Sequence, residues 1–230
     1  MKGLGWAAVS IVLALPYSIG EQQSGVGGVG QTNPSYLTWT SAQAQQIGRS
    51  TRVNGRVGGA FDFRVAHTEH SYNYKLRATW LTAEVIRATA RLAQLSEGLS
   101  NEQTEALVGD AEAAGETVVM VELDPNEGSG VIPLDWTAFL GPKGSQPGEP
   151  GIAKGSSQSA LRNVRALSGV FRRDYNYEVF WVVFSLGGET GKPLFPENVP
   201  EAELVVRIYN KEGRAKWPVP ESIRNRRKTG

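Results

Sequence analysis

Two histidines and one glutamate lie close together in the stretch FRVAHTEHSYNYK, and they are the first candidates for chemistry. His67 and His70 are the only histidines of the chain, and Glu69 lies between them. Zinc sites use three or four histidine, cysteine or carboxylate ligands, and the chain contains no cysteine. A site built on these residues would need carboxylates from elsewhere. We therefore expect His67 to pack on a tyrosine at the rim of a strand and His70 to be a solvated loop residue. We expect no cofactor, with a metal-dependent domain as an alternative.

Three carboxylates form a second candidate in the stretch DPNEGSGVIPLD, which contains Asp124, Glu127 and Asp135. The stretch imitates a calcium loop, but glycine falls at the fifth position and aspartate at the twelfth, where that loop needs an oxygen ligand and a bidentate glutamate. Two carboxylates that converge in space can also cleave glycosides. A hydrolase using these carboxylates is therefore the alternative to a non-catalytic function.

Trp136 follows these carboxylates directly and is the aromatic side chain that we expect to be exposed. Trp80, Trp181 and Trp217 fall on the apolar faces of predicted strands, which favours core packing. Trp136 is therefore the candidate for binding a partner.

The first residues, MKGLGWAAVSIVLALPYSIG, have the pattern of an export signal. A basic residue precedes an apolar run, and small residues end it. The run is too short to span a membrane. We predict a signal peptide over residues 1–20, cleavage after Gly20, no membrane span after cleavage, and a periplasmic or extracellular location. The absence of cysteine from an exported chain favours a bacterial origin.

The next residues, 21–57, are rich in Gly, Ser and Gln and poor in large apolar residues. Such a stretch buries too little surface to offset the entropy of ordering it, so it is predicted to be a flexible leader, although Tyr36, Leu37 and Trp39 could dock locally.

The net charge of +1 gives no overall field that would attract nucleic acid. We expect no nucleic-acid partner.

Two runs with period two predict a β-hairpin. Apolar residues alternate with polar ones over 61–67 and again over 72–80. A four-residue loop between the runs would pair Val65 with Tyr74 and Phe63 with Leu76, with every apolar side chain on one face. In this register His67 is the last inward residue of the first strand and His70 lies in the loop.

The period then changes to that of helices. Thr82 is a predicted N-cap, Gly98 ends the first helix, and Ser100 with Gln103 forms a predicted capping box for a second helix. The helical pair covers about residues 82–114. Further strands are predicted over 117–124 and in the apolar run of 179–184. A third strand places Leu204, Val206 and Ile208 inward and turns through 210–213 into a short partner with Ala215 and Trp217.

Residues 141–159 are too rich in Gly and Pro for a regular element, and a loop of this length is either functional or disordered. The last residues, 224–230, form a basic tail that cannot build a core.

These elements together predict one α+β domain over residues 58–223. Antiparallel strands would form a β-sandwich-like pair of sheets, and the helical pair would pack on one face. The favoured function is an exported, non-catalytic binding or structural module of the cell envelope or extracellular space, with an envelope protein or polymer as its partner.

Overall fold

A computed structural model describes residues 34–59, 73–115, 117–187 and 193–225. It contains a sheet of nine strands in the order β5-β4-β8-β9-β1-β2-β3-β7-β6, with antiparallel pairing throughout. The strands are β1 (Arg52–Val57), β2 (Tyr74–Trp80), β3 (Thr117–Pro125), β4 (Thr137–Pro142), β5 (Ala153–Lys154), β6 (Ser156–Ser157), β7 (Glu178–Phe184), β8 (Glu201–Ile208) and β9 (Lys211–Pro218).

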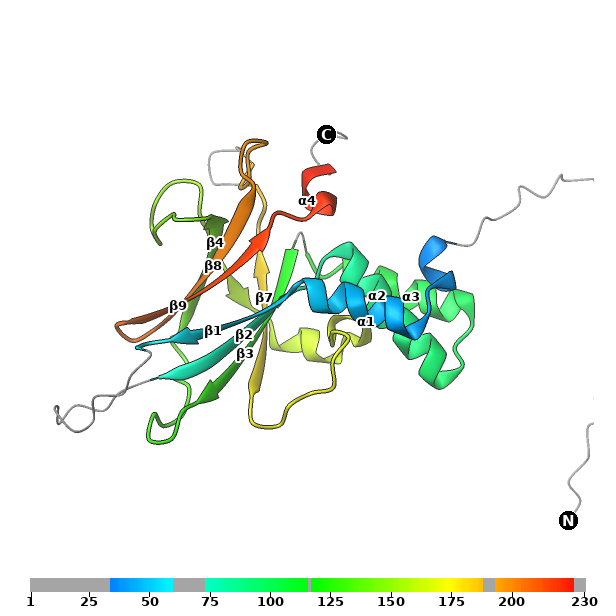
Figure 1. Cartoon of the computed structure of the whole chain (residues 1–230), viewed down its shortest axis with the longest axis horizontal. Helices are drawn as coiled ribbons and strands as arrows, with labels where there is room; N and C mark the ends of the chain where they lie inside the picture. The colour runs from blue at the N-terminus through cyan, green and yellow to red at the C-terminus, as the bar shows by residue number, and fades with distance from the viewer. Residues whose placement is uncertain (1–33, 60–72, 116, 188–192, 226–230) are drawn as a thin grey trace, which may run out of the picture. The chain divides into compact units, whose positions relative to one another are not determined.

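The two edges of this sheet are joined by a short stretch of chain, which we call the bridging segment, residues 153–157. Its first half is β5, which pairs with β4, and its second half is β6, which pairs with β7. Gly155 lies between the halves, and its N–H donates to the carbonyl of Ala138 at 2.9 Å. The sheet therefore curls into a nearly closed barrel (Figure 1).

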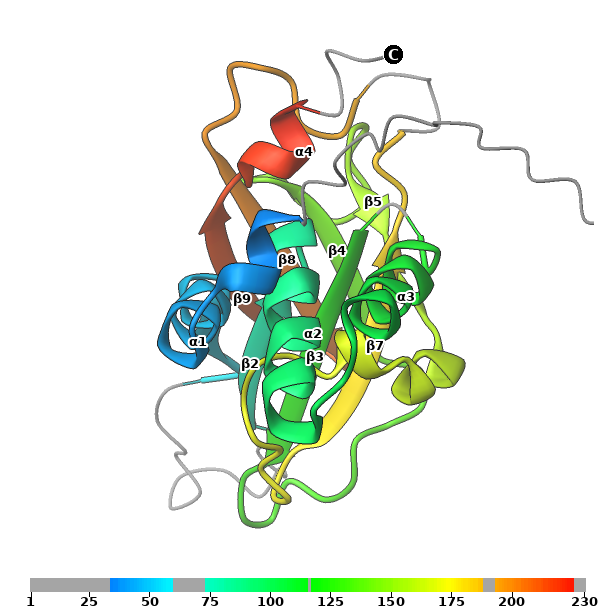
Figure 2. The same ribbon diagram turned by 90° about the vertical axis from the view of Figure 1, so that its right-hand side faces the viewer.

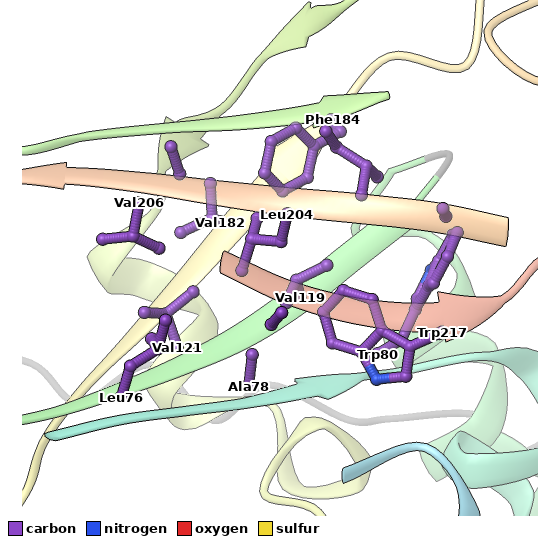
Figure 3. Close-up of a cluster of buried hydrophobic side chains, with 14 of the residues drawn as sticks. Leu76, Ala78, Trp80, Val119, Val121, Val182, Phe184, Leu204, Val206 and Trp217 are labelled. Atoms are coloured by element: carbon purple, nitrogen blue, oxygen red, sulfur yellow. The ribbon is translucent and has the colours of Figure 1, made fainter. Parts of the chain in front are cut away.

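The predicted α+β class with antiparallel strands is confirmed, but the sandwich is not: the strands form one curled sheet. Alternation along a strand shows which residues face inward, and the same alternation occurs in a barrel and in a sandwich. The sequence pattern therefore could not distinguish the two architectures. Side chains from strands around the barrel fill its interior, among them those labelled in Figure 3.

A helical layer covers the outer face of the sheet over β2, β3 and β7 (Figures 1 and 2). It consists of η1 (Ser35–Thr38), α1 (Ser41–Ser50), α2 (Ala83–Glu97), α3 (Asn101–Glu112), η2 (Ser159–Asn163) and η3 (Arg165–Leu167), and a short helix, α4 (Glu221–Asn225), follows β9. A second apolar core lies between this layer and the sheet, where Val85 and Ile86 of α2 pack with Met120 and Trp181. Within the described ranges, none of the helices has the length and apolar character needed to cross a membrane.

The caps of α2 and α3 agree with the prediction. The Thr82 hydroxyl accepts a hydrogen bond from the N–H of Val85, and Gly98 ends α2 with a left-handed φ of 69°. Ser100 and Gln103 form the predicted capping box of α3. These capping signals depend only on residues close together in the sequence, so the sequence alone was enough to predict them.

The predicted partner of β2 is wrong. β2 pairs with β1 on one side and β3 on the other, so Tyr74 lies opposite Val57 and Leu76 lies opposite Gly55. Residues 61–67, the predicted partner, and the candidate metal ligands His67, Glu69 and His70 lie outside the described residues. The alternation in β2 set its inward face correctly, but alternation carries no information about which strand lies beside it.

The end of the predicted leader is also corrected. Residues 35–57 form η1, α1 and β1. Tyr36 and Leu37 are each only 6% exposed and belong to the core under the helical layer, and a capping box between Thr40 and Gln43 begins α1. A few large apolar side chains and one cap order a stretch whose average composition favours disorder.

The loop predicted over 141–159 contains the end of β4 together with β5 and β6, so it holds regular elements despite its Gly and Pro content. Of the predicted basic tail, Arg224 lies in α4 and donates a hydrogen bond to the carbonyl of Pro200 at 3.2 Å. Residues 226–230 lie outside the described residues.

Candidate binding site

β4 and β7 separate at one end of the bridging segment. Gly155 still bonds to Ala138 of β4, but Ser156 and Ser157 pair with β7 instead. The two strands diverge from this point and leave an open cavity of about 430 Å³, which we call the β4–β7 slot. Its walls are residues 132–138 on one side and Glu178, Phe180 and Val182 on the other, and Lys154, Gly155 and Ser157 close its end.

Aromatic side chains from both strands meet in the slot. Trp136 is half-buried, and its ring contacts Phe180 edge to face, with centroids 5.0 Å apart and planes inclined by 66°. Both residues pack against the barrel core. Trp136 was predicted to be exposed, but it is only partly exposed. Its ring packs against Phe180 and also lines the slot.

Large apolar side chains extend this surface into solvent. Leu134 is 103% exposed and Val131 is 81% exposed, and both lie in the chain that leads into β4. Leu134 also lines the slot. Leu134 therefore offers an exposed apolar side chain at the cavity wall, where a ligand or partner can bury it.

The edge of β7 continues past its last partner at the slot. Gln158 donates the final backbone hydrogen bond to this edge, at the carbonyl of Trp181, 2.8 Å away. The backbone N–H and C=O groups of successive residues alternate between the two edges of a strand. The backbone groups of Val179 therefore face the same edge of β7 as those of Trp181. Among the described strands, none pairs with residues 178–180 on that side. The slot thus combines apolar walls with free strand edge.

The three predicted carboxylates do not gather at one place. Asp135 is exposed and lines the slot. Asp124 accepts a hydrogen bond from the ammonium group of Lys75 at 2.9 Å in an ion pair, and Glu127 is exposed in the turn after β3. The carboxylate that shares the slot with Asp135 is Glu178, which sequence reasoning missed because its neighbours in space come from β4.

An ion-pair network around one buried carboxylate anchors the chain that follows β4. Glu203 of β8 is 3% exposed. It accepts hydrogen bonds from the Arg214 guanidinium at 2.8 Å and from the N–H of Gly144 at 3.1 Å. Burial alone would raise the pKa of Glu203, but the Gly144 N–H and the Arg214 and Lys216 cations together lower it below its ordinary 4.5. The ionised carboxylate therefore holds the start of the 143–152 turn against the barrel.

No metal cluster is found in the part of the chain that the structure describes: three or more histidine, cysteine or carboxylate side chains are nowhere gathered in it to hold an ion. The residues predicted as metal candidates lie outside that part, so the metal alternative stays a prediction.

Comparison with known proteins identifies no relative: no family model matches the chain, and it matches no curated protein and no solved structure.

Proposed function

We propose that the protein is an exported, non-catalytic binding module that takes up an extended segment of a protein partner in the β4–β7 slot. The observation that carries this proposal is the free edge of β7 at residues 178–180, directly beside an apolar cavity. An added strand would gain main-chain hydrogen bonds from such an edge, while a pocket beside it selects a side chain.

The walls of the slot favour an apolar anchor on the partner. Trp136 and Phe180 offer aromatic surface inside the slot, and Leu134 offers an exposed side chain at its margin. Leucine, isoleucine or an aromatic side chain of the partner would replace water on these surfaces, which is favourable in proportion to the apolar area buried.

Charge at the slot favours a basic residue beside that anchor. Asp135 and Glu178 are both exposed at the walls, and Lys154 is the single basic side chain among the lining residues. The local charge is therefore negative, although the whole chain carries +1. A partner segment with an apolar residue next to lysine or arginine is complementary.

The same carboxylates give little support to the hydrolase alternative. Asp135 and Glu178 are exposed to water, whereas a general acid in glycoside cleavage works from a sheltered, apolar environment. Asp124 is committed to Lys75.

Peptide selection on the mature protein tests the binding proposal. Peptides selected from a random library should carry an apolar residue beside a basic one. Their affinity should fall about tenfold or more in Leu134→Asp, because the aspartate removes the apolar contact with the anchor and must be desolvated beside it, which outweighs its attraction for the basic residue. Leu95→Asp, at another exposed leucine, in α2, is the matched control and should bind normally.

Hydrogen exchange at one amide distinguishes strand addition from any other contact. The N–H of Val179 should exchange more slowly in the peptide complex than in the free protein. The proposal is wrong if no peptide is selected, if Leu134→Asp binds like the parent protein, or if the Val179 amide is unaffected. Export is tested separately by intact mass, which should place the first residue of the exported chain at Glu21.

A further inference from the structure

A second cavity lies on the opposite face of β7, on the side of the helical layer. Phe180 and Val182 point into the β4–β7 slot, whereas Val179 and Trp181 alternate to the other face and line this cavity. Its volume is about 230 Å³, and we call it the Trp181 pocket. Residues 168–173, between η3 and β7, supply most of its remaining wall.

The inner walls of the Trp181 pocket are apolar and fixed in place. Met120, Phe171, Val179 and Trp181 line them. The indole N–H of Trp181 donates to the carbonyl of Leu167 at 2.8 Å, which fixes the ring orientation. The Arg52 guanidinium lies 4.5 Å from the centroid of the Phe171 ring, a cation–π contact that holds the opposite wall. Contacts within the protein therefore hold two walls of the pocket.

One carboxylate lies in the pocket wall, and its charge is already compensated. Glu122 is 4% exposed. A guanidinium nitrogen of Arg52 lies 3.3 Å from its carboxylate, and both side chains are largely shielded from solvent. The pair adds a polar surface to the pocket but no net charge.

The outer part of the pocket carries uncompensated positive charge. Arg162, Arg172 and Arg173 line it and are exposed. Among the described residues, no carboxylate forms an ion pair with any of these three, whereas the nearby Arg165 is paired with Glu97. Guanidinium groups in this state are suited to bidentate binding of a carboxylate, sulfonate or phosphate.

Access to the pocket is open on the helical side. Arg162, Ser168, Phe171 and Arg172 also line a wider, open cavity of about 760 Å³, which continues to α1 and α2. A ligand can therefore reach the Trp181 pocket without any movement of the barrel.

We propose that the Trp181 pocket binds a small organic anion with a compact apolar body. The body lies against Met120, Val179 and Trp181, and the anionic group is held by Arg162 and Arg172 where the pocket meets the open cavity. The pocket is smaller than the roughly 300–1,000 Å³ of typical ligand sites, which limits the body to about one or two rings. This site lies on the other face of β7 from the slot and does not depend on peptide binding there.

Calorimetric titration of the whole mature protein with naphthalene-2-carboxylate tests the proposal. The uncharged naphthalene-2-methanol has the same body and isolates the contribution of the charge. The carboxylate should bind at least tenfold more tightly than the alcohol, and the difference should shrink as salt is added, because salt screens exposed charges. Equal affinities, or no binding of the carboxylate at millimolar concentration, would overturn the proposal.

Substitutions at the pocket locate the site. Arg162→Gln and Arg172→Gln should each weaken binding of the carboxylate about tenfold and leave the alcohol unaffected. Arg49→Gln is the matched control, since Arg49 is an exposed arginine of α1 that lines neither cavity. Val179→Phe, which fills the pocket, should abolish binding of both probes. Unchanged binding in both pocket arginine variants, or an equal loss in Arg49→Gln, would refute the assigned site even if Val179→Phe fails to fold.

Discussion

Some side chains of the β4–β7 slot were predictable from the sequence around them, and others were not. Trp136 and Asp135 were recognisable from sequence because an aromatic and a carboxylate stand beside a Gly- and Pro-rich stretch. Phe180 was not recognisable, because its strand reads as a continuous apolar run. Glu178 was not recognisable either, because its neighbours in space come from β4. Only the pairing of the bridging segment leaves their edge open.

Glu203 gives a prediction at the same scale. Its pKa is lowered in the folded protein by the Gly144 N–H and by Arg214 and Lys216, which outweigh its burial. A group with a lowered folded pKa contributes stability above its ordinary value of 4.5, and this stability is lost as the pH falls through the folded pKa. We therefore expect the free energy of unfolding to decrease as the pH is lowered from about 5.

Glu203→Gln separates this carboxylate from the others. The variant should be less stable at neutral pH by roughly 1–3 kcal/mol, the cost of a lost charged hydrogen bond, and should lose less stability on acidification than the parent protein. Urea unfolding at neutral and acidic pH measures both. Identical pH dependence in the two proteins would contradict the assigned role of Glu203.

Among the elements, the bridging segment decides the architecture. A Cβ added at Gly155 would lie 2.3 Å from a methyl carbon of Val182 and 2.7 Å from the ring of Phe184. At Gly155 the segment therefore lies too close to Val182 and Phe184 to admit a side chain unless they move. Chain composition marked this region as irregular, but the close approach that requires glycine is a tertiary contact.

Gly155→Ala should lower the free energy of unfolding by about 1–3 kcal/mol, since Val182 and Phe184 must move to admit the methyl group. Gly109→Ala is the control, because Gly109 lies in α3 with nothing within 4 Å of an added Cβ. That substitution should stabilise the protein by about 0.5–1 kcal/mol. Urea midpoints that move in the same direction for both variants would argue against closure at Gly155.

At the scale of the whole molecule, two cores share one sheet. The barrel interior is filled from strands around the sheet, and the outer core depends on η1, α1 and α2. Tyr36, Leu37 and Ala44 are buried in these N-terminal elements. We therefore count η1 and α1 as part of the folded unit, although the sequence assigned them to a leader.

Two truncations test this assignment. A chain that begins at Pro34 retains η1 and α1 and serves as the reference. A chain that begins at Thr51 should be destabilised by more than the roughly 2–5 kcal/mol expected for Leu37→Ala alone, because it removes the other buried side chains as well. Calorimetry of the two chains compares them, and equal melting temperatures would show that η1 and α1 add nothing to the core.

The sequence by itself determined the features that depend on near neighbours along the chain. These are the inward faces of β2 and β8, the caps of α2 and α3, and the long apolar strands β3 and β7. The inward faces follow from the two-residue period, the strands β3 and β7 from continuous apolar runs, and the helix caps from residues within a few positions of each helix end.

Only the tertiary structure decided which strands are neighbours, how the sheet closes and which charges gather. β1 replaced the predicted partner of β2, the bridging segment joined β4 to β7, and the folded chain placed Arg162 and Arg172 beside Val179 and Trp181. The physical reason is the same in each case. Periodicity specifies the face that a side chain occupies, whereas strand neighbours and charge clusters depend on contacts between segments far apart in the sequence.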